Sequence, residues 1–461
     1  MTLLWTDALI FLLLLASVSI AYYLHGKEHI QRPLNKIARS KVGMVSLVVL
    51  LFFLLVGLLD SIHFSSNKES TNEIISLLDY FATPLREHTE KTYSAPFATT
   101  LYSKEMTEKD GTMQWDYPRL THGGSHLADP ERDKVFDVLK KTAFGFLIGF
   151  ALFCIFLLIY RFVRCEFLGQ YFINIVPMPL PEARPLSDLN KPVLISLFSI
   201  ITISATLCYL SLYYHVLGTD KVGEDVFYQA IKSIRTGLVI GTMTTLIMLP
   251  LAILFGILAG FFRGWVDDVI QYLYTTLNSI PGVLLIAASV LMVQVYMANH
   301  EEQFTSVIVR ADMRLLFLCM ILGVTSWTGL CRLLRAETLK LREMEYVQAA
   351  YALGVKQHAI LLRHILPNVM HIVLISVVLD FSSLVLAEAV LSYINIGVDP
   401  TTYSWGNMIN GARLEMAREP IVWWSLSAAF VFMFALVLAA NLFADVVQDA
   451  FDPRSAGNEG A

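Results

Sequence analysis

The chain of 461 residues alternates long apolar runs with shorter polar segments. A helix that crosses the hydrocarbon core of a bilayer needs about 20 predominantly apolar residues. Nine runs have this length, and each predicts a membrane-spanning helix. Their approximate bounds are 5–24, 43–63, 143–162, 193–213, 237–261, 279–298, 314–333, 370–392 and 422–446. The pattern predicts an all-α polytopic membrane protein whose ends lie on opposite sides of the membrane, because nine is odd.

The composition agrees with this class of protein. Hydrophobic residues make up 56% of the chain and charged residues 16%, whereas soluble domains contain about 25% charged residues. The net charge of −5 gives no indication of nucleic acid as a partner. The five cysteines form no CxxC pair, so no disulfide framework or thiolate metal site is indicated. MTLLWTD has no basic residue before the first run, which predicts a retained span rather than a signal peptide.

Basic residues predict the orientation of the spans. The loop 25–42 contains five Lys or Arg and the loop 334–369 contains five more, while Arg161 and Arg164 follow the third span. Loops with an excess of Lys and Arg are usually cytoplasmic. Alternation through nine spans satisfies all three positions. We therefore expect the N-terminus outside and the C-terminus in the cytoplasm.

The polar segments divide the chain into regions. The segment 64–142 becomes an extracytoplasmic insertion, in which SLLDYF (76–81) predicts a helix and TYSAPFATTLY (92–102) a strand. The prolines of VPMPLPEARP disfavour helix and predict an extended cytoplasmic crossing within 163–192. The expected regions are N-terminal spans 1–63, the insertion 64–142, an additional span pair 143–213, a core 214–450 and a disordered tail 451–461.

One polar stretch between two spans has an unusual composition. EYVQAAYALGVKQHAILLRHILPN (345–368) is too polar to cross a membrane, yet it is rich in Ala, Leu and Ile. Residues 337–353 lack Pro and Gly and favour helix. On helical spacing Val347, Ala350, Tyr351 and Gly354 share one face.

The second half of this stretch predicts a bend and another helix. Gly354 can adopt a positive φ and end the first helix. Val355, Ala359 and Leu362 then align on a second helix, and Pro367 marks the entry to the next span. Small residues at the bend would allow a partner to approach closely. The alternative is an amphipathic interfacial helix that merely joins two spans.

The same stretch resembles the "EAA" loop of ABC importer permeases. That family pattern is Glu-Ala-Ala, three residues, Gly, nine residues, then Ile-x-Leu-Pro. In this chain Gln348 replaces the Glu and His364 stands at the Ile position. In the family this loop docks into a groove of the ATPase subunit. The resemblance implies an ATPase-coupling loop over 335–368, with the site residues Glu345, Gln348, Ala349, Ala350, Gly354, Leu366, Pro367 and Asn368.

Further motifs resemble the C-type permease subunit of dipeptide, oligopeptide and nickel importers. In order they are HVLGTDKVGEDVF (215–227), GFFRGWVDDVI (260–270), LAEAVLSYINIGV (386–398), SWGNMI (404–409) and NLFADVVQDAFDPR (441–454). Glu224 stands where that family has Arg, so an ionic role at this position is unsupported. The resemblance covers about 215–454 and also 35–60. It implies a six-span core to which 5–24 and 64–190 are additions.

This resemblance also implies partners. They are a second, B-type permease subunit, two ATPase subunits that bind ATP and Mg²⁺, an extracytoplasmic solute-binding protein and the lipid of a bacterial inner membrane. The chain has no GxxxxGK[ST] motif, so we expect it to bind no nucleotide, cofactor or metal of its own and to catalyse no reaction. Its motifs predict a binding-protein face that comprises Gly218, Thr219, Asp220, Trp405, Gly406 and Asn407.

Three residues within spans are candidates for the translocation pathway. Asp380 and Glu388 are eight residues apart and can line one face of a helix. The alternative is packing in which each carboxylate bonds to a neighbouring helix. Pro281 predicts either a kink at the pathway or an ordinary helix start. HGGSH (122–126) has a metal-like His spacing, but its two glycines favour a surface turn.

The sequence thus predicts the transmembrane permease subunit of an ATP-driven peptide importer, which works by alternating access. Two rivals belong to other classes. An ion-driven secondary transporter would show inverted repeats and broken helices, which the sequence does not reveal. A sensor or assembly protein could use a permease core together with the segment 64–142 to bind a ligand.

Overall fold

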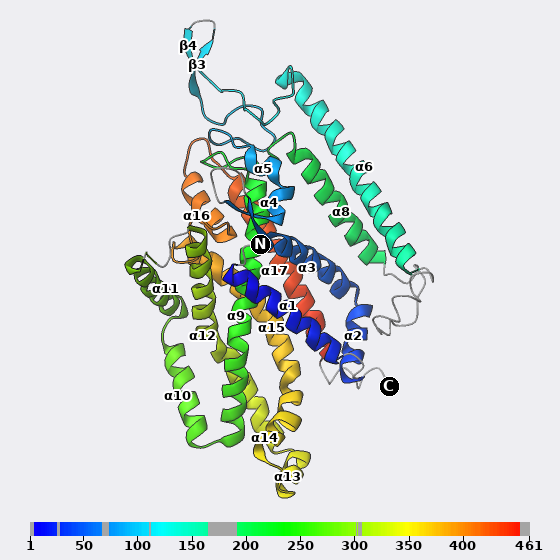
Figure 1. Ribbon diagram of the computed structural model, residues 1–461, viewed down its shortest axis with the longest axis vertical. Coiled ribbons are helices and arrows are strands. Elements are labelled where there is room, and N and C mark those ends of the chain that lie inside the picture. The colour runs from blue at the N-terminus through cyan, green and yellow to red at the C-terminus, as the bar shows by residue number, and fades with distance from the viewer. Residues whose placement is uncertain are drawn as a thin grey trace.

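The structure of the chain is a computed structural model that describes residues 4–24, 28–66, 73–109, 112–164, 191–300, 302 and 307–451. The predicted extended crossing falls mostly on 165–190 and the predicted tail on 452–461, so both lie outside the described residues. The remaining chain is almost entirely helical (Figure 1). The predicted all-helical polytopic fold is confirmed in this general form.

Helices form the body of the molecule. They are α1 (Trp5–Leu24), α2 (Glu28–Arg39), α3 (Lys41–Asp60), α6 (Pro130–Arg164), α8 (Lys191–Ser211), α9 (Val226–Phe262), α10 (Trp265–Ser279), α11 (Gly282–Asn299), α12 (Val307–Arg342), α15 (Leu366–Tyr393), α16 (Trp405–Glu415) and α17 (Trp424–Phe451). Among these, α2, α10 and α16 were not anticipated. They are short helices between spans, so no 20-residue apolar run announces them.

Seven helical segments of the described chain are long and apolar enough to cross a membrane, rather than the predicted nine. They are Lys41–Asp60, Arg132–Arg161, Lys191–Ser211, Val226–Phe262, Gly282–Asn299, Gln357–Tyr393 and Trp424–Phe451. The other two predicted spans fall on α1 and α12. Both form helices, but neither is among the seven spanning segments. In α1 only the shorter stretch Trp5–Leu15 qualifies as an apolar helix, and α12 carries Arg310, Asp312 and Arg314 near its start.

The centre of the molecule is the pair α9 and α12, with α15, α17 and α3 packed around α9 (Figure 1). Glycines let α9 and α12 approach closely. A Cβ on Gly256 would lie 2.7 Å from the Leu334 Cβ, and one on Gly260 would lie 2.6 Å from the Thr338 Cβ. Such close backbone packing is the usual way in which helices associate in a membrane, where lipid removes most of the hydrophobic driving force.

The α6–α8 hairpin stands at the side of this body, where α8 packs against α3. The described residues between α3 and α6 (61–66, 73–109 and 112–129) make up most of the insertion predicted at 64–142 and lie at one end of the molecule (Figure 1). Its elements are β1 (His63–Ser66), β2 (Glu73–Ser76), α4 (Leu77–Phe81), α5 (Thr83–Glu87), β3 (Glu105–Lys109) and β4 (Thr112–Asp116). The pairs β1–β2 and β3–β4 are both antiparallel.

Two predictions for the insertion have opposite outcomes. The helix predicted at 76–81 is confirmed as α4, which begins with a capping box formed by Ser76 and Asp79. The strand predicted at 92–102 is wrong, since the segment forms turns with only an isolated bridge from Thr100 to Arg119. Its backbone bonds instead to the body of the molecule. The Ser94 carbonyl accepts from Thr219 N and Phe97 N donates to the His215 carbonyl.

Candidate functional site

The loop between α12 and α15 lies at the end of the molecule opposite the insertion (Figure 1). It contains α13 (Glu345–Ala352), α14 (Gln357–Ile360) and a single π-helical turn, η3 (Leu361–Ile365). The predicted helix, turn and helix are therefore present. Val347, Ala350, Ile360 and Ile365 are buried in a core cluster shared with α9, α12 and α15. This inner face holds the loop on the helices at its two ends.

Gly354 forms the bend, as predicted, with φ at +75°. Leu353 N donates to the Ala349 carbonyl and Val355 N to the Ala350 carbonyl, so the last turn of α13 is closed. A Cβ at Gly354 would meet nothing within 4 Å. Within this chain the glycine is therefore required for its left-handed backbone, which other residues adopt only at a cost. No close approach within the chain explains it.

Polar contacts fix the base of the loop to neighbouring helices. Arg335 donates from Nε and Nη2 to the two carboxylate oxygens of Asp267, at 2.6 and 2.7 Å. Arg342 donates to the Phe261 carbonyl at 2.7 Å. Such a bidentate pair restrains orientation as well as distance. These contacts tie the end of α9 and the start of α10 to the base of the loop.

The outer face of the loop exposes the site residues and several large apolar side chains. Ala350 is buried and Leu366 half-buried, whereas Glu345, Gln348, Ala349, Gly354, Pro367 and Asn368 are exposed. Around them lie the exposed side chains of Met344, Tyr346, Tyr351, Leu353 and Leu362. Leu353 has 83% of its surface exposed. A grouped set of exposed apolar side chains is typical of a protein interaction surface.

At the opposite end, a buried ionic cluster joins the insertion to the segment between α8 and α9. Glu90 of the insertion accepts hydrogen bonds from Thr121 N, His122 N and Gly123 N at 2.8–3.1 Å. His215 lies between two carboxylates, with Nδ1 2.8 Å from Asp225 Oδ2 and Nε2 3.5 Å from Glu90 Oε1. We call Glu90, His215 and Asp225 the clamp.

The surroundings of His215 and Glu90 favour the charged form of each side chain. Burial alone would lower the pKa of His215, but hydrogen bonds and attraction from Asp225 and Glu90 raise that pKa to about 9. Burial alone would raise the pKa of Glu90, but the nearby His215 and hydrogen bonds from Thr121 and His122 hold that pKa well below its ordinary value of 4.5. The raised pKa predicts a protonated His215 at neutral pH, paired with Asp225 and lying near Glu90.

These shifts predict how attachment of the insertion depends on pH. Because the pKa of His215 is raised in the folded chain, its charged form contributes fully to attachment of the insertion below pH 6.5. That contribution is lost as the pH rises toward 9. Because the pKa of Glu90 is lowered, its carboxylate contributes fully to attachment of the insertion above pH 4.5. That contribution is lost as the pH falls below 4.5. Hydrogen-exchange protection factors at Thr121–Gly123 should therefore be highest between pH 4.5 and 6.5 and decline toward pH 9. His215→Gln should remove the alkaline decline, and a flat profile in the parent chain would contradict the clamp.

Comparison with known proteins identifies the family. A profile described as binding-protein-dependent transport system inner membrane component matches residues 252–457, which include the whole loop from α12 to α15. The glutathione transport system permease protein GsiD of Pectobacterium atrosepticum is 30% identical over 240 residues, or 52% of this chain and 73% of that protein. The chain belongs to this family of inner membrane components. It is therefore a multi-pass, non-catalytic permease subunit.

Other permeases of the family show the same degree of similarity. The dipeptide transport system permease protein DppC of Lactococcus lactis is 30% identical over 241 residues, covering 52% of this chain and 64% of that protein. The oligopeptide transport system permease protein OppC of Mycobacterium tuberculosis is 30% identical over 241 residues, covering 52% and 76%. The family profile begins at residue 252, so α1, the insertion, α6 and α8 all precede it.

The predicted binding-protein face of the permease is largely internal. Thr219 and Trp405 are almost fully buried, and Gly218 and Gly406 are buried as well. The Thr219 hydroxyl accepts from Ser94 N, and Trp405 Nε1 donates to the Ala230 carbonyl. Asp220 and Asn407 are half-buried and bond within their own loops. Within this chain these residues are mostly buried, and Ser94 of the insertion contacts Thr219, so a role of the six residues at a binding-protein face stays a prediction.

The predicted pathway residues occupy three different environments. Glu388 is buried and accepts a hydrogen bond from the Ser392 hydroxyl at 2.7 Å, so it lies in packing between α15 and α16. Asp380 is half-buried on α15. Pro281 is exposed and directly precedes α11, where its carbonyl accepts from Leu284 N and Leu285 N. The helix-start interpretation fits Pro281. A pathway role for Asp380 stays a prediction.

Sequence reasoning missed the residues that the structure joins at both ends. Glu90 and His215 are 125 positions apart, and Asp267 and Arg335 are 68 apart. Only GFFRGWVDDVI and HVLGTDKVGEDVF indicated that these segments mattered.

HGGSH does form the predicted turn, in which His126 Nε2 lies 2.7 Å from Asp137 Oδ2. No group of metal-binding residues is found within the part of the chain that the structure describes.

Proposed function

We propose that this chain is the C-type transmembrane subunit of an ATP-driven importer for peptides. The observation that carries the proposal is the loop at the end opposite the insertion, whose inner face is part of the helix core and whose outer face is apolar and exposed. The loop would dock onto an ATPase subunit in the cytoplasm. A second, B-type permease, two ATPases and a solute-binding protein would complete the complex. ATP and Mg²⁺ would be bound by the ATPases.

The contacts of the loop suggest how motion would pass from an ATPase to the membrane. Val347 and Ile365 pack into the core cluster with α9 and α12, so the loop cannot move without the attached helices. The Arg335–Asp267 pair would extend the displacement to α10. Closure of the ATPases would thus tilt α12 and α15 together. This rigid coupling supports alternating access.

The class of cargo is supported by the relatives. Those permeases are named for transport of glutathione, dipeptides and oligopeptides, all of which contain amide bonds between amino acids. The inner membrane location belongs to the family. Placement of the loop in the cytoplasm rests on the five basic residues of 334–369.

We further propose that the solute-binding protein meets the insertion. In the β3–β4 hairpin Met106 is paired with Trp115, and Glu108 with Met113, so these four side chains share one face. Met106, Met113 and Trp115 are exposed, Trp115 to 65%. Trp and Met are enriched at protein interfaces. The hairpin projects from the end opposite the loop (Figure 1).

Purification from the native membrane tests the proposed function. The chain, extracted in a mild detergent, should bring with it a P-loop ATPase and a second permease, both identifiable by mass spectrometry. Isolation of the chain alone, or as a homo-oligomer, in several detergents would contradict the coupling role. Ion-driven transport or a sensor role would then explain the fold better.

Replacing Trp115 by Asp tests the binding-protein face separately. The side chain is exposed, so the fold should survive, while a carboxylate in an apolar interface should weaken binding of the solute-binding protein at least tenfold. Retention of the binding protein on immobilised complex is the measurement. The ATPase should stay bound, because the loop lies at the other end. Unchanged retention of the binding protein would exclude this face.

A further inference from the structure

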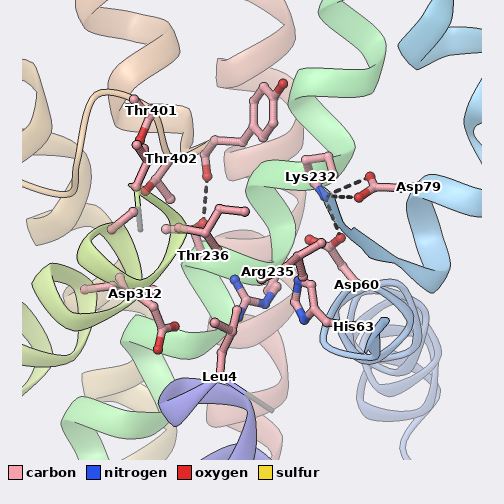
Figure 2. A pocket seen from close by; sticks show the side chains of 16 residues that line it. Leu4, Asp60, His63, Asp79, Lys232, Arg235, Thr236, Asp312, Thr401 and Thr402 are labelled. Carbon is pink, nitrogen blue, oxygen red and sulfur yellow. Dashed lines mark hydrogen bonds and ion pairs between the residues drawn. The ribbon is translucent and has the colours of Figure 1, made fainter. Parts of the chain in front are cut away.

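A cavity of about 240 Å³ lies between α1, α9, α12 and the start of the insertion (Figure 2). This volume is several times the roughly 30 Å³ that one water molecule occupies in the liquid. Its walls combine charged side chains with the loop before α16. They comprise Leu4, Asp60, His63, Ile74, Asp79, Lys232, Arg235, Thr236, Val307, Ile308, Ala311, Asp312, Leu315 and Thr401–Tyr403. Neither the family motifs nor the proposed coupling uses this cavity.

Both cations of the cavity are already engaged. Lys232 Nζ lies 2.9 Å from Asp60 Oδ1 and 2.8 Å from Asp79 Oδ1 (Figure 2). Arg235 donates to Asp7 Oδ1 at 2.6 Å, just outside the lining. Asp60 and Asp79 accept further hydrogen bonds from Ser76 and Tyr228. Arg235 is also attracted to Asp312 and keeps a buried Nε without a hydrogen-bond partner in the described structure, but its direct ion pair is with Asp7.

Asp312 is the carboxylate without such a partner. It accepts hydrogen bonds from the backbone N and the hydroxyl of Thr6 and is only 5% exposed. Across the described ranges it forms no ion pair. Asp7, Asp60, Asp79 and Asp312 are all buried, against the two cations Lys232 and Arg235. His63 lies 2.8 Å from Asp7. Even with a charge on His63, the four carboxylates would outnumber the positive side chains. Burying an unpaired charge is costly.

A polar atom and an apolar rim complete the site. The Thr402 hydroxyl is buried without a hydrogen-bond partner in the described structure, and Thr402 lines the same cavity as Asp312. Thr236 donates to the Tyr403 carbonyl at 2.6 Å and so holds this wall in place. At the margin Val307 and Ile308 expose apolar surface. An organic cation could therefore enter past apolar contacts.

We propose that this cavity binds a primary ammonium group of the transported peptide, with the Asp312 carboxylate as its counter-ion and the Thr402 hydroxyl as a hydrogen-bond acceptor. The group can be the α-ammonium or that of a lysine side chain. Three donors on one compact cation suit a carboxylate and a hydroxyl that line the same cavity. Thr6 of α1 orients Asp312, so an element that precedes the family profile helps to build the site. The cargo class in this proposal rests on the proposed function.

Calorimetric titration of the purified full chain in detergent tests the site. Alanyl-alanine carries an α-ammonium, Nα-acetyl-lysine amide carries only a side-chain ammonium, and N-acetyl-alanyl-alanine carries neither. At least one of the first two should bind, and the ligand that binds identifies the source of the group. The third should bind at least tenfold more weakly. Equal binding of all three, or of none, would overturn the proposal.

Variants keep the test specific. Asp312→Asn should weaken binding at least tenfold, and Thr402→Val should weaken it severalfold without disturbing the fold, because its hydroxyl forms no hydrogen bond within the described residues. The exposed Glu419→Gln should change nothing. Binding that survives both cavity variants would overturn the proposal. Copurification of the ATPase with a chain that does not bind ammonium would leave the importer function standing and remove only this site.

Discussion

Replacing Leu353 by Asp is expected to abolish stable association with the ATPase while leaving the chain folded in the membrane. Leu353 is 83% exposed beside the Gly354 bend, so its replacement costs no internal packing. Within an apolar interface, an unpaired carboxylate must lose its water. Disruption of an interface hot spot costs about 2 kcal/mol or more, which is roughly a thirtyfold loss of affinity. ATPase retained per permease after purification is the measurement.

Another exposed leucine, Leu414, provides the control for introducing a charge at an exposed position. Leu414 on α16 is 71% exposed and lies nearer the insertion end of the molecule (Figure 1). Leu414→Asp introduces the same charge and should retain the ATPase. If Leu353→Asp retains the ATPase as fully as Leu414→Asp does, the outer face of the loop is not the docking surface.

The second large effect is expected for Gly223→Ala, which should release the insertion from the helix body. Gly223 has φ at +83°, and an added Cβ would lie 1.8 Å from the Glu90 carbonyl oxygen. Glu90 N also donates to the Gly223 carbonyl at 2.9 Å. The substitution therefore adds a backbone clash to strain of about 1–3 kcal/mol. Limited proteolysis should cut residues 88–127 at least tenfold faster than in the parent chain.

Gly264 provides a control for a left-handed glycine that does not contact the insertion. It also has a positive φ, +59°, but a Cβ there would meet nothing within 4 Å. Gly264→Ala should therefore show backbone strain alone and leave cleavage of the insertion unchanged. Slow cleavage in Gly223→Ala would mean that the insertion does not depend on this contact for its attachment.

The chain by itself determined the features that depend on local pattern. Apolar runs of sufficient length identified the helices, because a spanning helix must satisfy its backbone internally and present apolar side chains to lipid. The loop was equally readable. Its helical spacing grouped Val347 and Ala350, which are buried, although Tyr351 of the same predicted face is exposed to 64%. In the second predicted stripe Val355 and Leu362 are exposed. Gly354 predicted the left-handed bend that the structure shows. Ordered motifs identified the family for the same reason, since each is a short continuous stretch.

Only the tertiary structure decided which polar groups meet. Thr6 bonds to Asp312, 306 positions away, and Lys232 reaches Asp79 across 153. In sequence each is an isolated polar residue beside an apolar run, and no spacing rule links them. The segment 92–102 looked like a strand because its local composition cannot reveal that its hydrogen bonds go to the 215–219 loop. A residue's charge can be read from the sequence, but its compensating partner depends on how distant helices pack together.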